Sequence, residues 1–222
     1  MLSFSAGPAT ECLWVSDALR SRAPVSLTAK RAFDVVVAAA LVLLLMPLLA
    51  AVAVVVYVTS PGGALFLQPR VGYLGQPFTM FKFRTMIDGA ERQEQRLART
   101  SHRTFMKLKQ DPRTTRVGRF LRRYSLDELP QLFNVLRGDM SLVGPRPLLL
   151  SDLEKLPRHQ QLPRFAMKPG ITGLWQVSGR SHTSDEQRMR LDLAYVNHWS
   201  VWLDLKILAR TIPVVLRAEG AI

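Results

Sequence analysis

Residues 32–58 read AFDVVVAAALVLLLMPLLAAVAVVVYV, in which Asp34 is the one charged residue and the run from Val35 to Val58 is apolar apart from the Tyr57 hydroxyl. At about 1.5 Å of rise per residue this run extends about 36 Å as a helix, and a bilayer's hydrocarbon core is about 30 Å thick. The sequence therefore predicts a membrane segment over residues 30–60. A cleaved signal peptide is the alternative, but the apolar run is too long and continues past the cleavage-like residues 51–53.

Pro47 interrupts the middle of this segment and bears on its path through the bilayer. A proline inside a helix costs about 3 kcal/mol and frees a carbonyl, so we expect a kink there. Because basic residues flank both ends, the positive-inside tendency favours both ends on the cytoplasmic face. We therefore predict a re-entrant helix that dips into the bilayer and returns, with a kinked single span as the alternative. The flanking residues are Arg20, Arg22, Lys30 and Arg31 before the segment and Arg70, Lys82 and Arg84 after it.

The composition of the 222-residue chain favours one catalytic domain, which we place at residues 61–222, after a tail at residues 1–29. The formal charge of +13, from 30 Lys and Arg against 17 Asp and Glu, indicates an acidic partner. Nucleic acid, anionic lipid and a phosphorylated substrate all fit that charge. The single cysteine, Cys12, excludes an intramolecular disulfide and a multi-cysteine zinc site. The four histidines show no ligand spacing, so none is assigned to a metal.

A small β-hairpin is predicted after the membrane segment, with strands at residues 64–68 and 78–84 around a turn at residues 72–75. Residues 81–86, FKFRTM, alternate aromatic and basic side chains, which could present Lys82 and Arg84 on one face. A half-buried edge strand with solvated charges is the alternative. Residues 113–123 then carry five arginines, but no recognisable nucleic-acid-binding module accompanies them. On a membrane they would more simply meet lipid headgroups.

Residues 122–147, RRYSLDELPQLFNVLRGDMSLVGPRP, place adjacent carboxylates between arginines. Pro130 and Gly138 suit the start and end of a short helix, and Asp127 and Glu128 lie at its N-terminal approach, where the helix dipole favours anions. With a divalent cation and arginines around them, two acids can hold a phosphate and attack it. A capping box from Ser125 to Glu128 is the structural alternative.

Two further loops fit phosphate chemistry. Residues 143–147, VGPRP, fix the main chain around Arg146 with two prolines, which suits a phosphate clamp. Residues 169–180, PGITGLWQVSGR, form a glycine-rich loop that could approach a nucleotide or a sugar closely, with a generic structural turn as the alternative. Further on, Ser184 begins one predicted helix and Ser200 caps a second, which runs to residue 212 and is interrupted at Pro213. The second helix either lies in the lipid headgroup region or packs against the core.

Four runs in this chain resemble the bacterial sugar transferases, specifically the monotopic phosphoglycosyl transferases. They are KRAFD at residues 30–34, FKFRTM at 81–86, SLDELPQLFNVLRGDMSLVGPRP at 125–147 and KPGITGLWQVSGR at 168–180. The likeness covers about residues 30–222. Larger members of that family carry extra membrane helices ahead of this unit, so the chain looks like a small form with its own N-terminal tail.

The resemblance implies an α+β, mainly helical fold with a re-entrant membrane helix, a small β-hairpin and interfacial amphipathic helices. It implies transfer of a sugar 1-phosphate from a UDP-sugar to polyprenyl phosphate, with release of UMP, at the cytoplasmic face of the bacterial inner membrane. Membrane lipid is then a partner and nucleic acid is not, and self-association into a homo-oligomer is left open. Residues 174–176 and 214–217 resemble members that use hexoses in exopolysaccharide or O-antigen pathways more than members that use acetamido sugars.

The resemblance also implies roles for individual residues. Asp127 would be the nucleophile that forms an aspartyl-phosphosugar and would bind Mg²⁺, with Glu128 as its dyad partner. The phosphate-binding group would comprise Arg146, the main chain around Pro145, Arg122 for the polyprenyl phosphate, and Lys82. The nucleotide-sugar loop would contribute Gly170, Thr172, Gly173, Gln176 and Arg180.

Two other classes of function remain as alternatives. The first is a membrane-tethered protein that binds an anionic ligand, lipid or nucleic acid, through the arginines of residues 113–123. The second is a non-catalytic scaffold for glycan-assembly partners. A protein that binds an anionic ligand has no use for an acidic pair inside its basic surface, whereas a metal-dependent transferase requires such a pair.

Overall fold

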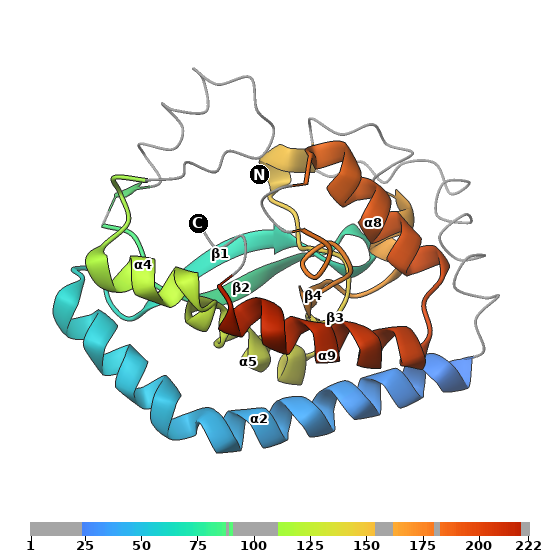
Figure 1. The fold of residues 1–222 in the computed structure, drawn as a ribbon, viewed down its shortest axis with the longest axis horizontal. Coiled ribbons are helices and arrows are strands. Elements are labelled where there is room, and N and C mark those ends of the chain that lie inside the picture. Colours follow the sequence, from blue (N-terminus) through green and yellow to red (C-terminus); the bar gives the residue numbers. More distant parts are fainter. Residues whose placement is uncertain (1–23, 88, 91–110, 154–161, 180–182, 219–222) are drawn as a thin grey trace.

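The computed structural model describes residues 24–87, 89–90, 111–153, 162–179 and 183–218, and this part of the chain is mainly helical (Figure 1). The expected small antiparallel sheet and long apolar N-terminal helix are both present. The elements are α2 (Pro24–Thr59), β1 (Leu65–Val71), η1 (Tyr73–Gly75), β2 (Pro77–Phe83), α4 (Arg116–Arg123), η2 (Leu126–Glu128), α5 (Gln131–Arg137), β3 (Ser141–Val143), α6 (Leu150–Leu153), η3 (Leu162–Ala166), β4 (Gly170–Thr172), α8 (Asp185–Asn197) and α9 (Val201–Leu216).

The apolar segment forms one long helix, α2, which begins at Pro24, earlier than the expected start at residue 30. Figure 1 shows that α2 bends partway along its length and runs beneath the rest of the domain. Pro47 is the proline inside this helix, and its missing N–H and its ring account for the bend. Among the described residues, α2 is the one helix long and apolar enough to cross a bilayer.

Both halves of α2 pack against the same domain. Ala38 and Val42, in the first half, join a core cluster that includes Val135 of α5. The second half contributes to a separate cluster with Phe83 of β2 and Leu121 of α4. The opposite face of α2 leaves large apolar side chains exposed, namely Val36, Leu43, Leu44, Met46, Leu48, Val54, Val55, Tyr57 and Val58. The helix therefore has one face for the domain and one apolar face without a protein partner among the described residues.

The predicted hairpin is confirmed. Strands β1 and β2 pair antiparallel from Leu65 opposite Phe83 to Val71 opposite Pro77, and η1 closes the turn. The side chain of Asn134, on α5, then binds the main chain of β2 on both sides. It accepts a hydrogen bond from the Phe81 N–H at 2.9 Å and donates one to the Thr79 carbonyl at 2.7 Å. This fully buried amide fixes α5 against the sheet edge.

The predicted short helix at residues 130–137 is confirmed as α5, which ends at Gly138 in the left-handed region (φ 98°). Directly after it, β3 pairs in parallel with β4, with Ser141 opposite Gly170 and Val143 opposite Thr172. The sequence did not predict this second sheet, whose strands have three residues each. It joins the Gly-Pro-Arg-Pro turn to the glycine-rich loop.

Ser184 and Ser200 cap α8 and α9 as predicted, and Ser184 forms a capping box with Gln187. The predicted interruption at Pro213 is wrong, because α9 continues to Leu216. Pro213 lies near the C-terminal end of α9, where its missing N–H removes one main-chain donor without ending the helix. The Thr211 hydroxyl, on the buried side of α9, lies 2.8 Å from the Thr172 hydroxyl of β4.

Helix α9 has one buried face and one exposed apolar face. Packing against the core explains the apolar residues of the buried face only. Asp204 and Ile207 are buried, and the exposed apolar residues are Val201, Trp202, Leu205, Ile212 and Leu216. Lys206 lies over the Trp202 ring, 5.5 Å from its centroid. An aromatic ring beside a lysine is typical of a helix at a lipid–water boundary.

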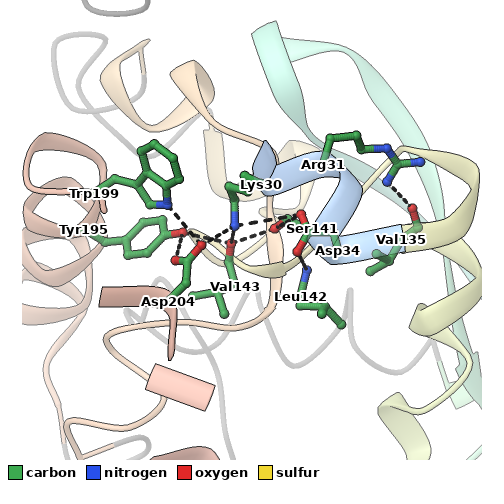
Figure 2. A network of polar contacts seen from close by, with 10 residues as sticks. All are labelled: Lys30, Arg31, Asp34, Val135, Ser141, Leu142, Val143, Tyr195, Trp199 and Asp204. Atoms are coloured by element: carbon green, nitrogen blue, oxygen red, sulfur yellow. Dashed lines mark hydrogen bonds and ion pairs between the residues drawn. The ribbon is translucent and has the colours of Figure 1, made fainter. Parts of the chain in front are cut away.

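A buried polar network joins α2 to β3, α8 and α9 (Figure 2). The Lys30 ammonium donates to Asp204 Oδ2 at 2.6 Å and to the Val143 carbonyl at 3.1 Å. The Tyr195 hydroxyl lies 2.7 Å from Asp204 Oδ1 and 3.0 Å from the same Val143 carbonyl. One turn along α2, Asp34 accepts a hydrogen bond from the Ser141 hydroxyl at 2.7 Å. The KRAFD run is therefore the polar attachment of α2 to the strand that precedes Arg146.

Candidate active site

The acidic pair lies in η2, between α4 and α5. Asp127 is 7% exposed, and Ser125, two residues earlier, adopts a left-handed conformation with φ of 54°. A non-glycine residue in that region carries about 1–2 kcal/mol of strain. The strained turn places η2 against β2, so that the hairpin and the acidic pair meet.

The capping-box alternative for Glu128 is wrong, because the Ser125 side chain makes no capping hydrogen bond. Pro130, which precedes α5, makes none either. Instead, the Lys82 ammonium donates to Glu128 Oε1 at 2.9 Å, and the two side chains are 17% and 28% exposed. Lys82 is therefore not a solvated charge on an edge strand, which was the other structural alternative. The hairpin supplies the cation beside the acidic pair.

The surroundings of Asp127 disfavour the charged form of its side chain. Burial raises the pKa of this carboxyl above its ordinary value, and the adjacent Glu128 raises it further. Lys82 and Arg122 oppose that rise by electrostatic attraction. Because burial still disfavours the charge of this carboxylate beside two cations, a further positively charged group would stabilise it.

Arg122 lies in the last turn of α4 and is oriented by two threonines. Its Nε donates to the Thr85 hydroxyl at 2.9 Å, and its Nη1 lies 3.5 Å from the Thr114 hydroxyl. The helix approaches Thr85 closely, since a Cβ on Gly118 would lie 2.0 Å from the Thr85 carbonyl oxygen. Arg122 is near enough to lower the pKa of Asp127 but does not pair with it.

A shallow surface depression brings several of the predicted site residues together. Its walls come from the hairpin, η2, the Gly-Pro-Arg-Pro turn and the glycine-rich loop. They include three cations and one carboxylate, a combination suited to a phosphate-bearing ligand. The lining residues are Arg70, Met80, Lys82, Glu128, Gln131, Arg146, Pro147, Gly170, Ile171 and Gln176.

The turn that carries Arg146 is joined to the glycine-rich loop by main-chain hydrogen bonds. Gly144 N–H donates to the Thr172 carbonyl, and Gly170 N–H donates to the Pro145 carbonyl, both at 2.9 Å. A Cβ on Gly144 or Gly170 would collide with the other segment's main chain. These glycines therefore allow two main-chain segments to touch, and the Arg146 guanidinium lies 5.2 Å from the centre of the Trp175 ring.

The remaining loop residues have different surroundings. Thr172 is buried and binds Thr211, and Gly173 is buried against Gly144. Gln176 lines the depression, and its buried Oε1 has no hydrogen-bond partner among the described residues. Arg180 lies outside the described residues.

Sequence reasoning missed one charged residue that lines the site and two that lie directly behind it. Arg70 of β1 lines the depression and donates to the Pro147 carbonyl at 3.2 Å. Arg164 of η3 and Asp192 of α8 form a buried ion pair that contacts the main chain of Arg146. The sequence contains no signal for this pair, because its members meet only through the tertiary fold.

Mg²⁺, which the family resemblance implies, fits the residues present. In phosphate-transfer sites it is usually held by one or two carboxylates together with substrate phosphates and water. Asp127 and Glu128 provide two adjacent carboxylates, and a cation would offset the unfavourable burial of the Asp127 charge. No cluster of three or more His, Cys, Asp or Glu side chains suited to a metal occurs within the described ranges.

Comparison with known proteins identifies relatives along most of the chain. The family model for bacterial sugar transferases matches residues 25–218. An undecaprenyl-phosphate galactose phosphotransferase of Salmonella typhimurium is 48% identical over 74% of this chain, and this match spans 36% of the relative's own length. The exopolysaccharide production protein ExoY of Sinorhizobium fredii is 38% identical over 96% of both chains. A UDP-glucose:undecaprenyl-phosphate glucose-1-phosphate transferase of Caulobacter vibrioides is 42% identical over 97% of this chain and 80% of its own.

Proposed function

This chain belongs to the bacterial sugar transferase family, and from that premise we propose that it transfers a sugar 1-phosphate from a UDP-sugar to polyprenyl phosphate, releasing UMP. The observation that carries the proposal is the buried Asp127 carboxylate, which lies beside Lys82 and Arg122 next to a depression lined with cations. The names of the Salmonella and Caulobacter relatives support the same chemistry. The product would begin an exopolysaccharide or O-antigen-type glycan.

The reaction proceeds in two displacements on one phosphorus atom. An Asp127 carboxylate oxygen attacks the phosphorus that bears the sugar, the bond to the bridging oxygen breaks, and UMP leaves with that oxygen. The resulting aspartyl-phosphosugar is then attacked by an oxygen of polyprenyl phosphate, which gives polyprenyl-diphosphate-sugar and regenerates the carboxylate. Because UMP leaves before the lipid reacts, ping-pong kinetics follow.

The protein's own residues hold the phosphates and limit the repulsion between anions. Arg146 and Lys82 line the depression, where their charges meet the diphosphate. Lys82 also neutralises Glu128, which keeps the second carboxylate from repelling the substrate. Mg²⁺, held by Asp127 with Glu128 nearby, would supply further charge stabilisation at the phosphates. Arg122, whose charge acts on Asp127, receives the phosphate of the lipid acceptor.

The position of α2 supports a re-entrant path rather than a single span. Both of its halves pack against one domain, so a helix that crossed the bilayer would have to carry part of that domain across. With its exposed apolar face in lipid, the helix enters and leaves the cytoplasmic face of the inner membrane, and α9 lies in the headgroup region. Cys12 tests this orientation: an impermeant thiol reagent should fail to label it in intact cells. Strong labelling there would contradict the re-entrant path.

The donor sugar is proposed to be a hexose, since the relatives' names specify galactose and glucose. The decisive experiment measures UMP release from a panel of UDP-sugars with polyprenyl phosphate and Mg²⁺. Asp127→Asn should abolish release, whereas Asp139→Asn, the same change near the end of α5, should retain it. Release that survives Asp127→Asn would remove the nucleophile assignment. No release by the unmodified protein with any donor would favour a binding protein or a scaffold.

A further inference from the structure

A buried ion pair lies directly behind the Gly-Pro-Arg-Pro turn. Arg164 comes from η3 and Asp192 from the middle of α8, and these residues are only 3% and 2% exposed. Arg164 Nη2 contacts Asp192 Oδ2 at 2.5 Å. Neither residue lines the depression that holds Lys82 and Glu128. The pair is therefore outside the site that would contact substrate, yet it is not at the surface.

Both members of the pair bind the main chain of one residue, Arg146. Asp192 Oδ2 accepts from the Arg146 N–H at 3.3 Å, and Arg164 Nη2 donates to the Arg146 carbonyl at 2.8 Å. The two peptide groups that flank the Arg146 Cα are thus each held by one member of the pair. Pro145 and Pro147 already restrict the torsions on either side. Together these constraints leave the Arg146 main chain a single orientation.

The direction of the Arg146 side chain follows from that fixed main chain. Its guanidinium lies over Trp175 and lines the depression. Burying an arginine and an aspartate has a desolvation cost that often exceeds their attraction, so such a pair is weak support for a purely stabilising role. The burial that raises the pKa of Asp192 reflects the same cost. Arg164 Nε and Nη1 and Asp192 Oδ1 are, moreover, buried without hydrogen-bond partners among the described residues.

We infer that Arg164 and Asp192 are positioning residues that fix the main chain of Arg146, so that its guanidinium points into the depression and meets the transferred phosphate. They act on the reaction only through Arg146. This inference rests on the proposed transferase function, but the arrangement of the main chain can be measured without it.

The test replaces the pair as a unit, because removing one member alone leaves an uncompensated buried charge and lowers stability strongly. Arg164→Met with Asp192→Leu removes both charges and the groups that hydrogen-bond to the Arg146 main chain. Arg137→Met with Asp139→Asn is the matched control, an ion pair at the end of α5 with Arg137 60% exposed. Each pair is changed in the full-length protein and again in an Arg146→Met background, and UMP release, thermal unfolding and amide hydrogen exchange are measured.

The Arg164–Asp192 double change should lower kcat/KM about 10- to 100-fold while the melting temperature stays within a few degrees. In the Arg146→Met background the same change should alter the rate less than about threefold, because the residue through which it acts is gone. The control should alter the rate less than about threefold in both backgrounds. Equal losses with and without Arg146 would overturn the inference, and so would an unchanged rate.

Hydrogen exchange separates this inference from the proposed function. The Arg146 amide should exchange more than about tenfold faster in the Arg164–Asp192 double variant than in the unmodified protein, while the β2 amides keep their protection. If no UDP-sugar is a substrate but this faster exchange occurs, the proposed function fails and the fixing of Arg146 stands. Unchanged protection of the Arg146 amide would overturn the inference even in an active enzyme.

Discussion

Gly144 is the residue at which one added methyl group should separate the two loops of the candidate site. It follows β3 directly as the first residue of the Gly-Pro-Arg-Pro turn, and its N–H donates to the Thr172 carbonyl. An alanine Cβ at this position would lie 2.3 Å from the Lys168 carbonyl oxygen and 2.7 Å from the Gly170 nitrogen. Both are main-chain atoms, so no side-chain rotation relieves the contact.

The required displacement sets the size of the effect. Ordinary Cβ contacts begin at 3.4 Å, so the two segments must move apart by about 1 Å. That movement stretches the hydrogen bonds from Gly144 to Thr172 and from Gly170 to Pro145, both 2.9 Å, beyond bonding distance. Two buried main-chain bonds lost at about 1–3 kcal/mol each lower the free energy of unfolding by about 2–6 kcal/mol. A misplacement of about 1 Å at Arg146 costs about 10²-fold in rate.

UMP release and thermal unfolding of Gly144→Ala check both figures, with Gly75→Ala as the control. Gly75 lies in the hairpin turn with φ of 74°, and an added Cβ there meets nothing within 4 Å. Its replacement strains the main chain by about 1–2 kcal/mol without moving β3 or β4. The control should lose stability and keep its rate. A Gly144→Ala protein with the unmodified kcat/KM, or rate losses that merely follow stability in both variants, would refute the reasoning.

Three further predictions concern charge and the membrane. Asp127→Asn should raise the melting temperature at neutral pH, because burial raises the pKa of the Asp127 carboxyl and its negative charge therefore opposes folding. As the pH falls towards the ordinary carboxyl range, the folded protein protonates Asp127 before the unfolded chain does, so the gain in melting temperature should shrink. Lys30→Met should lower the free energy of unfolding by about 3–5 kcal/mol, because it leaves Asp204 buried without its cation. Adding Asp204→Leu should recover most of the lost stability, and denaturation in detergent measures both variants. Leu43→Glu with Leu44→Glu, on the exposed face of α2, should shift the protein from the membrane fraction to the soluble fraction, and retention would contradict the contact of this face with lipid.

Local patterns predicted the elements whose signals lie within a short stretch. The apolar run with Pro47 predicted a long helix with a bend, and turn residues around Gly75 predicted the hairpin. Pro130 and Gly138 predicted the ends of α5 to within one residue. Each of these signals arises from main-chain preferences that a residue carries with it.

The contacts that build the site lie beyond the reach of such signals. The β3–β4 pairing rests on strands of three residues, too short for an alternating pattern to be recognised. Lys30 and Asp204 are 174 positions apart, and Arg164 and Asp192 come from separate helical elements. Sequence reasoning placed Lys30 among the charges that flank the membrane segment and gave the other three residues no role, because their partners are supplied only by tertiary packing.

The pairing of Lys82 with Glu128 shows how one tertiary contact decides several open interpretations. From the sequence, Lys82 could be a solvated charge and Glu128 a helix cap, and each interpretation was consistent alone. The Lys82 ammonium lies 2.9 Å from Glu128 Oε1, which excludes both interpretations and compensates the charge of Glu128. Asp127 is left as the carboxylate whose burial is not matched by a direct ion pair among the described residues. Two adjacent acids thus acquire different environments, which is the arrangement expected when one attacks a phosphate and the other supports it.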